Sequence, residues 1–506
     1  MRHDMHTPQR PGPLLLGTAF AVGVAADILL RAFPPGAGWT ACILILGAAP
    51  LALGALLGAP PARDSLVAAL AGALCALGIT LRDSPPLAFL NVCGALGACA
   101  LMTARTRTRT LHRTSLYELG HATLVHIVHA VAGAGFLLAR ELGPVRGGQP
   151  GRKNTVAAVV RGCAVAVPAI ALFGSLFASA DDAFRAIAGK LMDFDFGTLL
   201  SHALLTCTVA WTTAGFLRGA LVADEVPAPV TLRESFFSLG IVEIGMLLGL
   251  LDALFLLFVS LQIPYLFGGA ATVAGTPSLT FAGYFRKGFF ELTAVSCLTL
   301  VTLLLADWLL RKETPRATRI FRSLAAITLV LLGVIMASAW QRFFLYLDAY
   351  GLTELRVYAA ASLTVMGLVA GWFAWSVLTG RRQLFAGGAI AAAYAVVAAL
   401  TVINPDALIA RINIARAAAG KPLDVAYVSR LSADANAELI GGLALLPPAD
   451  ASALARNLLR FGDAEAGADP RTWNIARRRA LGAVRESRKL LEEFAAVEPS
   501  HNHAQE

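Results

Sequence analysis

The chain has few charged residues and none of the familiar catalytic motifs. Asp, Glu, Lys and Arg make up 15% of its 506 residues, whereas soluble domains carry about a quarter. The seven cysteines form no CxxC pair, which excludes a zinc ribbon or a dithiol redox centre. Glycine-rich phosphate loops, HExxH motifs and nucleophile elbows are also missing. We therefore expect no familiar enzyme, no cofactor and no metal site.

Long apolar runs dominate residues 1–402, and a polar stretch follows at 403–506. A hydrocarbon core of roughly 30 Å needs about 20 helical residues, and backbone groups in lipid must pair within a helix. We therefore predict an all-α polytopic bundle of eleven transmembrane helices with a small soluble helical domain at its C-terminus. The predicted spans are 13–31, 37–58, 65–81, 86–104, 154–178, 197–218, 236–260, 288–310, 321–340, 357–379 and 384–402.

Residues 117–140 are apolar but contain His121, His126 and His129. If this segment stays on the cytoplasmic side, most Lys and Arg residues fall in inner loops, as the positive-inside rule requires. We therefore expect a non-spanning amphipathic helix with a wet histidine face. The resulting topology has a cytoplasmic N-terminus and an extracytoplasmic C-terminal domain. If 117–140 crosses the membrane instead, the number of spans becomes even, and the C-terminal domain is then expected on the cytoplasmic side.

The net charge of +9 does not indicate nucleic-acid binding, because the surplus lies around the spans and the C-terminal domain is balanced. In that domain we predict short helices near 423–431, 435–446 and 453–461, and a long one from Pro470 to about Phe494. The domain is expected to be a stabilising cap or to bind a protein partner. The run Arg477–Arg479 could instead contact anionic lipid, which would favour a cytoplasmic domain.

Three stretches carry more charged and aromatic residues than spanning requires: 262–269 with 284–292, 341–356, and 404–416. In the predicted topology the first two lie at the outer ends of spans. Arginines beside tyrosines suit an anionic head group or a carboxylate ligand, so one interpretation is an outward polar pocket. An interfacial aromatic belt and a packing site for the C-terminal domain are the alternatives. The predicted pocket residues are Arg286, Glu291, Arg342, Tyr346, Asp348, Tyr350 and Arg356.

These stretches resemble the DUF4173 family of bacterial membrane proteins, which is close to the DUF4153 group. The resemblance covers about residues 240–480. It rests on Tyr-Leu-Phe-Gly-Gly at 265–269, Tyr-Phe-Arg-Lys-Gly-Phe-Phe-Glu-Leu at 284–292, the run 342–356, Asn404-Pro405-Asp406, and Trp473-Asn474. Phe343 stands where the family pattern leads us to expect methionine. The resemblance implies a polytopic membrane protein and no catalytic residues.

Four ionisable residues fall inside predicted spans, where an unpaired charge is costly. Asp27 has Arg31 four residues on, which predicts a local ion pair. Arg161 and Glu243 lie equally deep from the cytoplasmic side, so we predict that they pair. Asp252, nine residues from Glu243 and on the opposite helix face, is expected to face Arg286 or Arg342, or to be a hydrogen-bonded acid in a packed interface.

Three functions follow from this pattern. The spans, the intramembrane charges and the outward pocket favour a transporter or flippase-like protein in contact with membrane lipid. The terminal domain favours an envelope sensory or scaffolding protein. The Arg/Tyr/Asp cluster would also suit a membrane enzyme acting on a lipid-linked substrate, although no nucleophile or metal pattern accompanies it. The Ala-rich, Arg-over-Lys composition is typical of GC-rich bacteria, so we expect the bacterial cytoplasmic membrane.

Overall fold

The structure is a computed structural model. It describes residues 12–58, 60–103, 114, 116–137, 196–222, 238–273, 281–311, 314–464 and 469–497, with isolated positions between 162 and 181. Side chains at 262–273 and 281–290 are outside the description. The described chain is almost entirely helical, with one isolated bridge between Leu239 and Leu310. The all-α fold class predicted from the sequence is confirmed.

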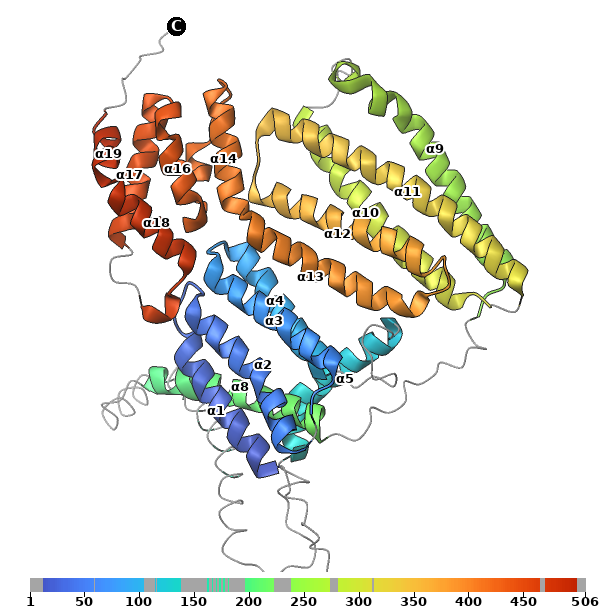
Figure 1. Ribbon diagram of the computed structural model, residues 1–506, viewed down its shortest axis with the longest axis horizontal. Coiled ribbons are helices and arrows are strands. Elements are labelled where there is room, and N and C mark those ends of the chain that lie inside the picture. Colours follow the sequence, from blue (N-terminus) through green and yellow to red (C-terminus); the bar gives the residue numbers. More distant parts are fainter. Residues whose placement is uncertain are drawn as a thin grey trace, which may run out of the picture.

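Two groups of helices form the membrane part (Figure 1). The first comprises α1 (Gly12–Leu30), α2 (Ala37–Leu56), α3 (Arg63–Leu81), α4 (Pro85–Thr103), α5 (Leu116–Phe136) and α8 (Phe196–Leu221). The second comprises α9 (Ile241–Val273), α10 (Phe281–Leu309), α11 (Pro315–Tyr350), α12 (Glu354–Ser376) and α13 (Phe385–Ile403). In it α9, α11, α12 and α13 form one layer, and α10 lies behind α11 and α12 in the view of Figure 1. The groups meet where α13 packs against α3 and α4, and there the Tyr394 hydroxyl donates to the Gly94 carbonyl at 2.6 Å.

The second group has the most continuous apolar core. Leu332, Ile335 and Ala339 of α11 pack against Phe255 and Val259 of α9. A second cluster on α9, α10 and α11 continues this contact toward the other end of the layer. Long leucines that point away from both clusters are exposed, as expected for side chains that face lipid.

Three turns share one end of the bundle, which we call the docking end: 31–36, 82–84 and 351–353. All three contact the C-terminal helices. The turns at 57–62, 311–314 and 377–384 lie at the opposite, far end. α1 to α4 therefore alternate in direction, as do α9 to α13, in agreement with the predicted weave.

The sides of the later helices do not depend on residues 117–140. α4 begins beside the turn 82–84 at the docking end and finishes at the far end. α8 begins at the docking end, where Arg31 donates to Ser201 at 2.8 Å. α4 and α8 therefore both begin at the docking end. In the described residues the turn 31–36 and the C-terminal helices share the docking end. The side of the membrane on which this end lies stays a prediction.

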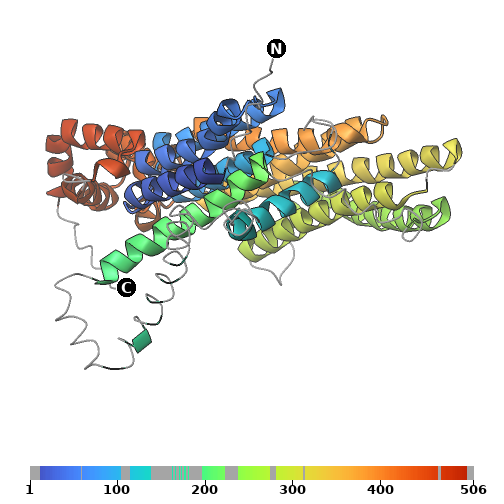
Figure 2. The same cartoon turned by 90° about the horizontal axis from the view of Figure 1, so that it is seen from below.

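The buried and exposed faces of α5 are the reverse of those predicted for an amphipathic helix. His126 is 5% exposed, whereas Leu124, Ile127 and Val131 are 56–64% exposed. The helix packs on α8 through glycines, since a side chain at Gly215 would lie against backbone oxygens of α5. The predicted wet histidine face is therefore wrong at His126, which is buried, while His121 and His129 are half-buried. Figure 2 shows α5 at the near face of the bundle.

Eleven helices in the described residues are long and apolar enough to cross a membrane. Ten of them match predicted spans, and the eleventh is α5 at Glu118–Phe136. The predicted span 154–178 lies almost wholly outside the described residues, as does its Arg161.

The C-terminal helices form a compact group beside the docking end (Figure 1). They are α14 (Pro405–Ala418), α15 (Val425–Val428), α16 (Asn436–Gly442), α17 (Pro448–Ala464), α18 (Ile475–Glu486) and α19 (Arg488–Ala495), with 3-10 turns between them. Leu439, Leu443, Leu454 and Leu458 are the centre of their apolar core. The single long helix predicted over 470–494 is wrong: Asn474 caps the start of α18, and Ser487 separates α18 from α19.

Candidate functional site

The predicted pocket residues occupy the turn between α11 and α12. Arg342, Tyr346, Asp348 and Tyr350 lie on the last turns of α11, and Arg356 lies on the first turn of α12. Glu291 is exposed on α10. The side chain of Arg286 is outside the description. Most of the predicted pocket residues therefore lie at the α11–α12 turn. The contacts of this turn show what these residues bind.

Arg356 is held by the end of α11. Its guanidinium lies 4.2 Å from the centre of the Tyr346 ring, and the Tyr346 and Tyr350 rings are 5.0 Å apart. The same guanidinium donates to the carbonyls of Tyr350, at 3.0 Å, and of Gly351. A cation at a helix C-terminus satisfies free carbonyls and offsets the negative end of the helix dipole. Arg356 therefore closes the α11–α12 turn.

The C-terminal helices supply further cations to the same turn. Arg416 of α14 donates to the carbonyls of Leu347, at 3.2 Å, and Asp348. Lys421 contacts both the Asp348 carbonyl, at 3.0 Å, and the Asp348 carboxylate, at 2.8 Å. The partner of Asp348 is thus a lysine of the chain itself, not Arg342 or Arg356. This arrangement matches the packing-site alternative, and Asp348 contributes no wall of a closed enzyme cavity.

Asn413 fixes the turn from the side of α14. Its amide accepts from the Leu352 backbone N–H at 3.1 Å and donates to the Leu352 carbonyl at 2.8 Å. The approach is close because Gly351 has no side chain and adopts φ of 75°. The Tyr427 hydroxyl accepts from the Glu354 backbone N–H at 2.8 Å. The C-terminal helices therefore hold this turn through hydrogen bonds to its backbone as well as through charge.

A second contact joins the C-terminal helices to the turn between α3 and α4. Arg477 of α18 forms an ion pair with Asp83, Nε to Oδ1 at 2.6 Å, and both side chains are largely buried. Arg477 also donates to the carbonyls of Thr472, at 2.6 Å, and Pro35, at 3.0 Å. The guanidinium is therefore fully used by the chain, and the predicted lipid contact of Arg477 is wrong.

Asp434 and Asn474 complete this second contact. Asp434 accepts from the Asp83 backbone N–H at 2.6 Å and pairs with Arg82 at 3.2 Å. Asn474 donates to the carbonyls of Ile79 and Arg82, both at 2.9 Å. The carbonyls at the end of α3 are thus capped by the C-terminal helices. We call the Asp83–Arg477–Asp434–Arg82 group the buried clamp.

Asp406 lies between the two contacts and is fully buried. One carboxylate oxygen accepts from the backbone N–H of Ser432, at 3.2 Å, and from the Ser432 hydroxyl. The other oxygen is buried without a hydrogen-bond partner among the described residues. Burial raises the pKa of this carboxyl, the Ser432 hydroxyl opposes the rise, and the charge on Asp434 adds to it. Burial likewise raises the pKa of Asp83, against the effect of Arg477.

Of the intramembrane charges, the described residues show the partners of Asp27 and Asp252. The Asp27–Arg31 pair is confirmed at 2.7 Å, and His202 of α8 joins it through Asp27 Oδ2. Asp252 is buried and contacts Thr328 at 2.6 Å, so its partner is not Arg342. This contact fits the alternative of a hydrogen-bonded acid in a packed interface, and the side chain of Arg286 lies outside the described residues. Glu243 is exposed on the first turn of α9, and the proposed Arg161–Glu243 pair involves a residue outside the description.

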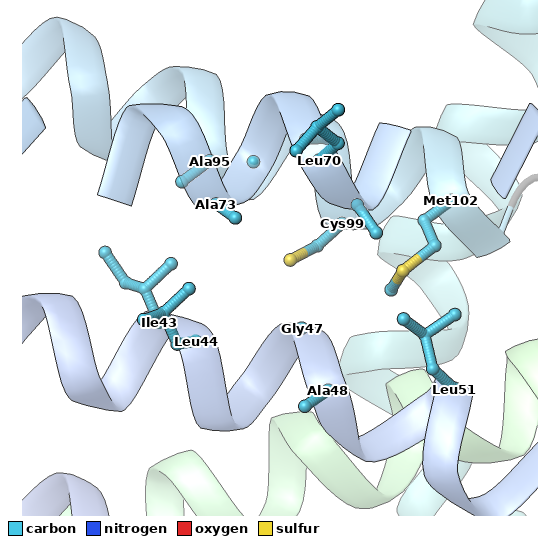
Figure 3. Close-up of a pocket in the computed structure, with 13 residues that line it drawn as sticks. Ile43, Leu44, Gly47, Ala48, Leu51, Leu70, Ala73, Ala95, Cys99 and Met102 are labelled. Carbon is cyan, nitrogen blue, oxygen red and sulfur yellow. The ribbon is translucent and has the colours of Figure 1, made fainter. Parts of the chain in front are cut away.

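A cavity of about 250 Å³ lies between α2, α3 and α4 (Figure 3). Its walls are aliphatic side chains, glycines and two sulfur atoms, including Leu51, Cys99 and Met102. The lining has no charged group and no side-chain oxygen or nitrogen, so it can hold hydrocarbon but cannot recognise an anion. The cavity therefore differs from the buried clamp, whose side chains are charged.

Sequence reasoning found one half of the docking interface and missed the other. The resemblance singled out Asn404-Pro405-Asp406 and Trp473-Asn474, and the polar stretch 404–416 contains Asn413 and Arg416. Each of these segments supplies or flanks a docking contact. Asp83 and Asp434 were not found. The signal available for Asp83 was an acid in a short Arg-Asp-Ser-Pro turn between two spans, which alone resembles an ordinary polar loop.

The helices and their docked C-terminal group define a polytopic α-helical membrane protein with a terminal helical module. The chain belongs to the family described as "Domain of unknown function (DUF4153)", whose family model matches residues 68–441. The DUF4173 name expected from the sequence is therefore replaced by its close neighbour. The match runs from α3 into α16 and so includes the turns 82–84 and 351–353 of the docking end, but not the turn 31–36. No curated protein and no solved structure matches the chain.

Proposed function

We propose that this protein is a sensory or scaffolding protein of the bacterial cytoplasmic membrane, in which the C-terminal helices couple the two groups of transmembrane helices. One observation carries the proposal. The buried clamp holds the α3–α4 turn of the first group, whereas Arg416, Lys421 and Asn413 hold the α11–α12 turn of the second. A change in the C-terminal module would therefore reach both groups at once.

The contacts at the α11–α12 turn weigh against an outward ligand pocket. Arg356 is engaged with backbone carbonyls of the α11–α12 turn, and Asp348 with Lys421. An anionic ligand would have to displace these internal partners. We therefore place the recognition of a partner on the outer surface of the C-terminal helices, and no longer at the predicted pocket.

The distribution of arginine supports an extracytoplasmic C-terminal module. Arg316, Arg319, Arg322, Arg381 and Arg382 lie at the far end. At the docking end, Arg31 and Arg82 are paired with carboxylates and Arg356 with carbonyls. Positive residues are kept on the cytoplasmic side. We propose that the far end faces the cytoplasm and that α5 is a span.

Three strains test the coupling role in the native host: a gene deletion, a deletion of residues 404–506, and Arg477→Ala. If the C-terminal module carries the function, all three give the same envelope-stress and transcript profile. Arg478→Ala is the matched control, because Arg478 is the exposed neighbour of the buried Arg477. Retention of the wild-type profile by the truncated protein, with normal membrane insertion, would refute the proposal.

Transport is the second candidate, and one observation favours it. Asp252 is a buried carboxyl midway along the span Ile241–Leu261 of α9, the kind of residue that marks ion and proton paths. A water-filled path predicts that Gly249→Cys, one turn away in a cysteine-free chain, reacts with a membrane-impermeant maleimide. A thiol that stays unreactive while an exposed cysteine at the far end reacts would reject this candidate.

A further inference from the structure

Asp252 lies at the centre of the second helix group. It is the twelfth residue of the span Ile241–Leu261 and is 8% exposed. Its Oδ1 atom is 2.6 Å from Oγ1 of Thr328 on α11. Its Oδ2 atom is buried and has no hydrogen-bond partner among the described residues. The carboxyl group is thus enclosed between α9 and α11.

No countercharge faces this carboxyl group from the described parts of the neighbouring helices. On α9, Glu243 is nine residues away and exposed. On α11, the charged residues that flank Thr328 are Arg322 and Arg342, about 9 and 21 Å along the axis at 1.5 Å per residue. On α10, Glu291 and Asp307 lie in the outer turns of the span. An isolated carboxylate in such surroundings is strongly disfavoured.

The hydroxyl of Thr328 gives an independent argument from counting hydrogens. It has one hydrogen but two acceptors, the Asp252 oxygen at 2.6 Å and the Leu324 carbonyl at 3.1 Å. If Asp252 is ionised, only one of these contacts can be a hydrogen bond. If Asp252 carries a proton, its O–H donates to Thr328, and Thr328 donates to Leu324. Both contacts of the Thr328 hydroxyl can be hydrogen bonds only if Asp252 is protonated.

We infer that Asp252 and Thr328 form a proton-binding site in the middle of the membrane and that Asp252 holds its proton at neutral pH. The ligand is a proton because only a protonated carboxyl lets the single hydrogen of the Thr328 hydroxyl go to Leu324 while the contact with Asp252 remains a hydrogen bond. Because the carboxyl group is enclosed, release of the proton requires water to reach it. This inference rests on the α9–α11 contact and is independent of the docking role proposed above.

Infrared spectroscopy of the full chain in lipid nanodiscs at neutral pH tests the site. A protonated carboxyl gives a carbonyl band above the amide I region, and a carboxylate does not. The band difference between wild type and Asp252→Asn should equal one protonated carboxyl. Asp307→Asn is the control, because Asp307 pairs with Arg382 at 3.2 Å, and it should leave the band unchanged. An Asp252→Asn spectrum identical to wild type in this region would overturn the inference.

Two variants of Thr328 keep the test decisive if Asp252→Asn does not fold. Thr328→Val removes the hydrogen bond and should shift the carboxyl band to higher frequency. Thr328→Ser keeps the hydroxyl and should restore the wild-type frequency. A band that stays in place in the valine variant would show that its carboxyl is not the one beside Thr328, which contradicts the assignment.

Discussion

Arg477 and Asp83 form an ion pair at 2.6 Å although they are 394 residues apart in the chain. The pair joins the last helices to a turn between two early spans, and its side chains are only 6% and 14% exposed. A buried pair of this kind contributes strongly to specificity, because either partner alone leaves an uncompensated charge. The relative placement of the C-terminal module and the bundle therefore depends on it.

Arg477→Ala should loosen the C-terminal helices. Asp83 would remain buried without its cation, at a cost of about 3–5 kcal/mol. We expect a lower Tm of the detergent-solubilised protein and faster proteolytic release of the C-terminal helices. Arg478→Ala should change neither. In the double variant Arg477→Ala/Asp83→Ala part of the loss should be recovered, and strictly additive losses would contradict the pairing.

The positions of the spans along the chain were predictable from the sequence, but some of their ends were not. Hydropathy placed α1 to α4 within two residues, because their apolar runs end in Gly, Pro or Arg. α11 was predicted at 321–340 and extends over Pro315–Tyr350. Its outer turns carry Arg342 and Asp348, which lower the local hydropathy. Packing against α9 and α10 keeps the polar turns helical, and a one-dimensional pattern does not contain that packing.

The candidate site, too, was predictable only in part. Arg342 to Arg356 stood out because arginine and tyrosine alternate at the end of a span, so their position could be inferred from sequence. Their partners could not, since Lys421 and Arg416 are separated from them by two complete spans. The orientation of α5 was misjudged for a related reason. Histidine was assumed to face water, whereas His126 faces the bundle because lipid excludes polar groups more strongly than a protein interior does.

Docking of the C-terminal helices should weaken as the pH rises. Burial raises the pKa of Asp406 above its unfolded value of about 3.9. The protonated carboxyl therefore stabilises the folded state fully below that value, and the contribution is lost as the pH rises through the folded pKa. We expect Tm to fall between about pH 4 and neutrality.

Asp406→Asn isolates the contribution of Asp406 to this pH dependence. The amide cannot ionise, so the difference in Tm between wild type and Asp406→Asn should become less favourable to wild type as the pH rises. Differential scanning fluorimetry over a pH series measures it. Parallel curves for the two proteins would show that Asp406 has the same pKa in the folded and unfolded chain.

Gly215 should be essential for the contact of α5 with α8. A side chain at this position would lie against the backbone carbonyls of His129 and Ala130. Close approach through glycines is the usual basis of helix pairing in membranes. Gly215→Leu should therefore lower Tm by an overpacking cost of about 1–3 kcal/mol or more. Gly249→Leu on α9, where nothing lies within 4 Å of the new side chain, should be tolerated, and equal losses in both variants would exclude a specific α5–α8 contact.

Single cysteines at the two ends of the bundle should react from opposite sides of the membrane. In a chain whose seven cysteines are replaced, Ala418→Cys lies on α14 beside the docking end and Gln383→Cys lies at the far end, and both positions are exposed. The arginine-rich far end is retained in the cytoplasm by the positive-inside rule. An impermeant maleimide should label Ala418→Cys in intact cells, and Gln383→Cys only after permeabilisation. The reverse pattern would place the C-terminal module in the cytoplasm, and labelling of both in intact cells would contradict the alternating weave.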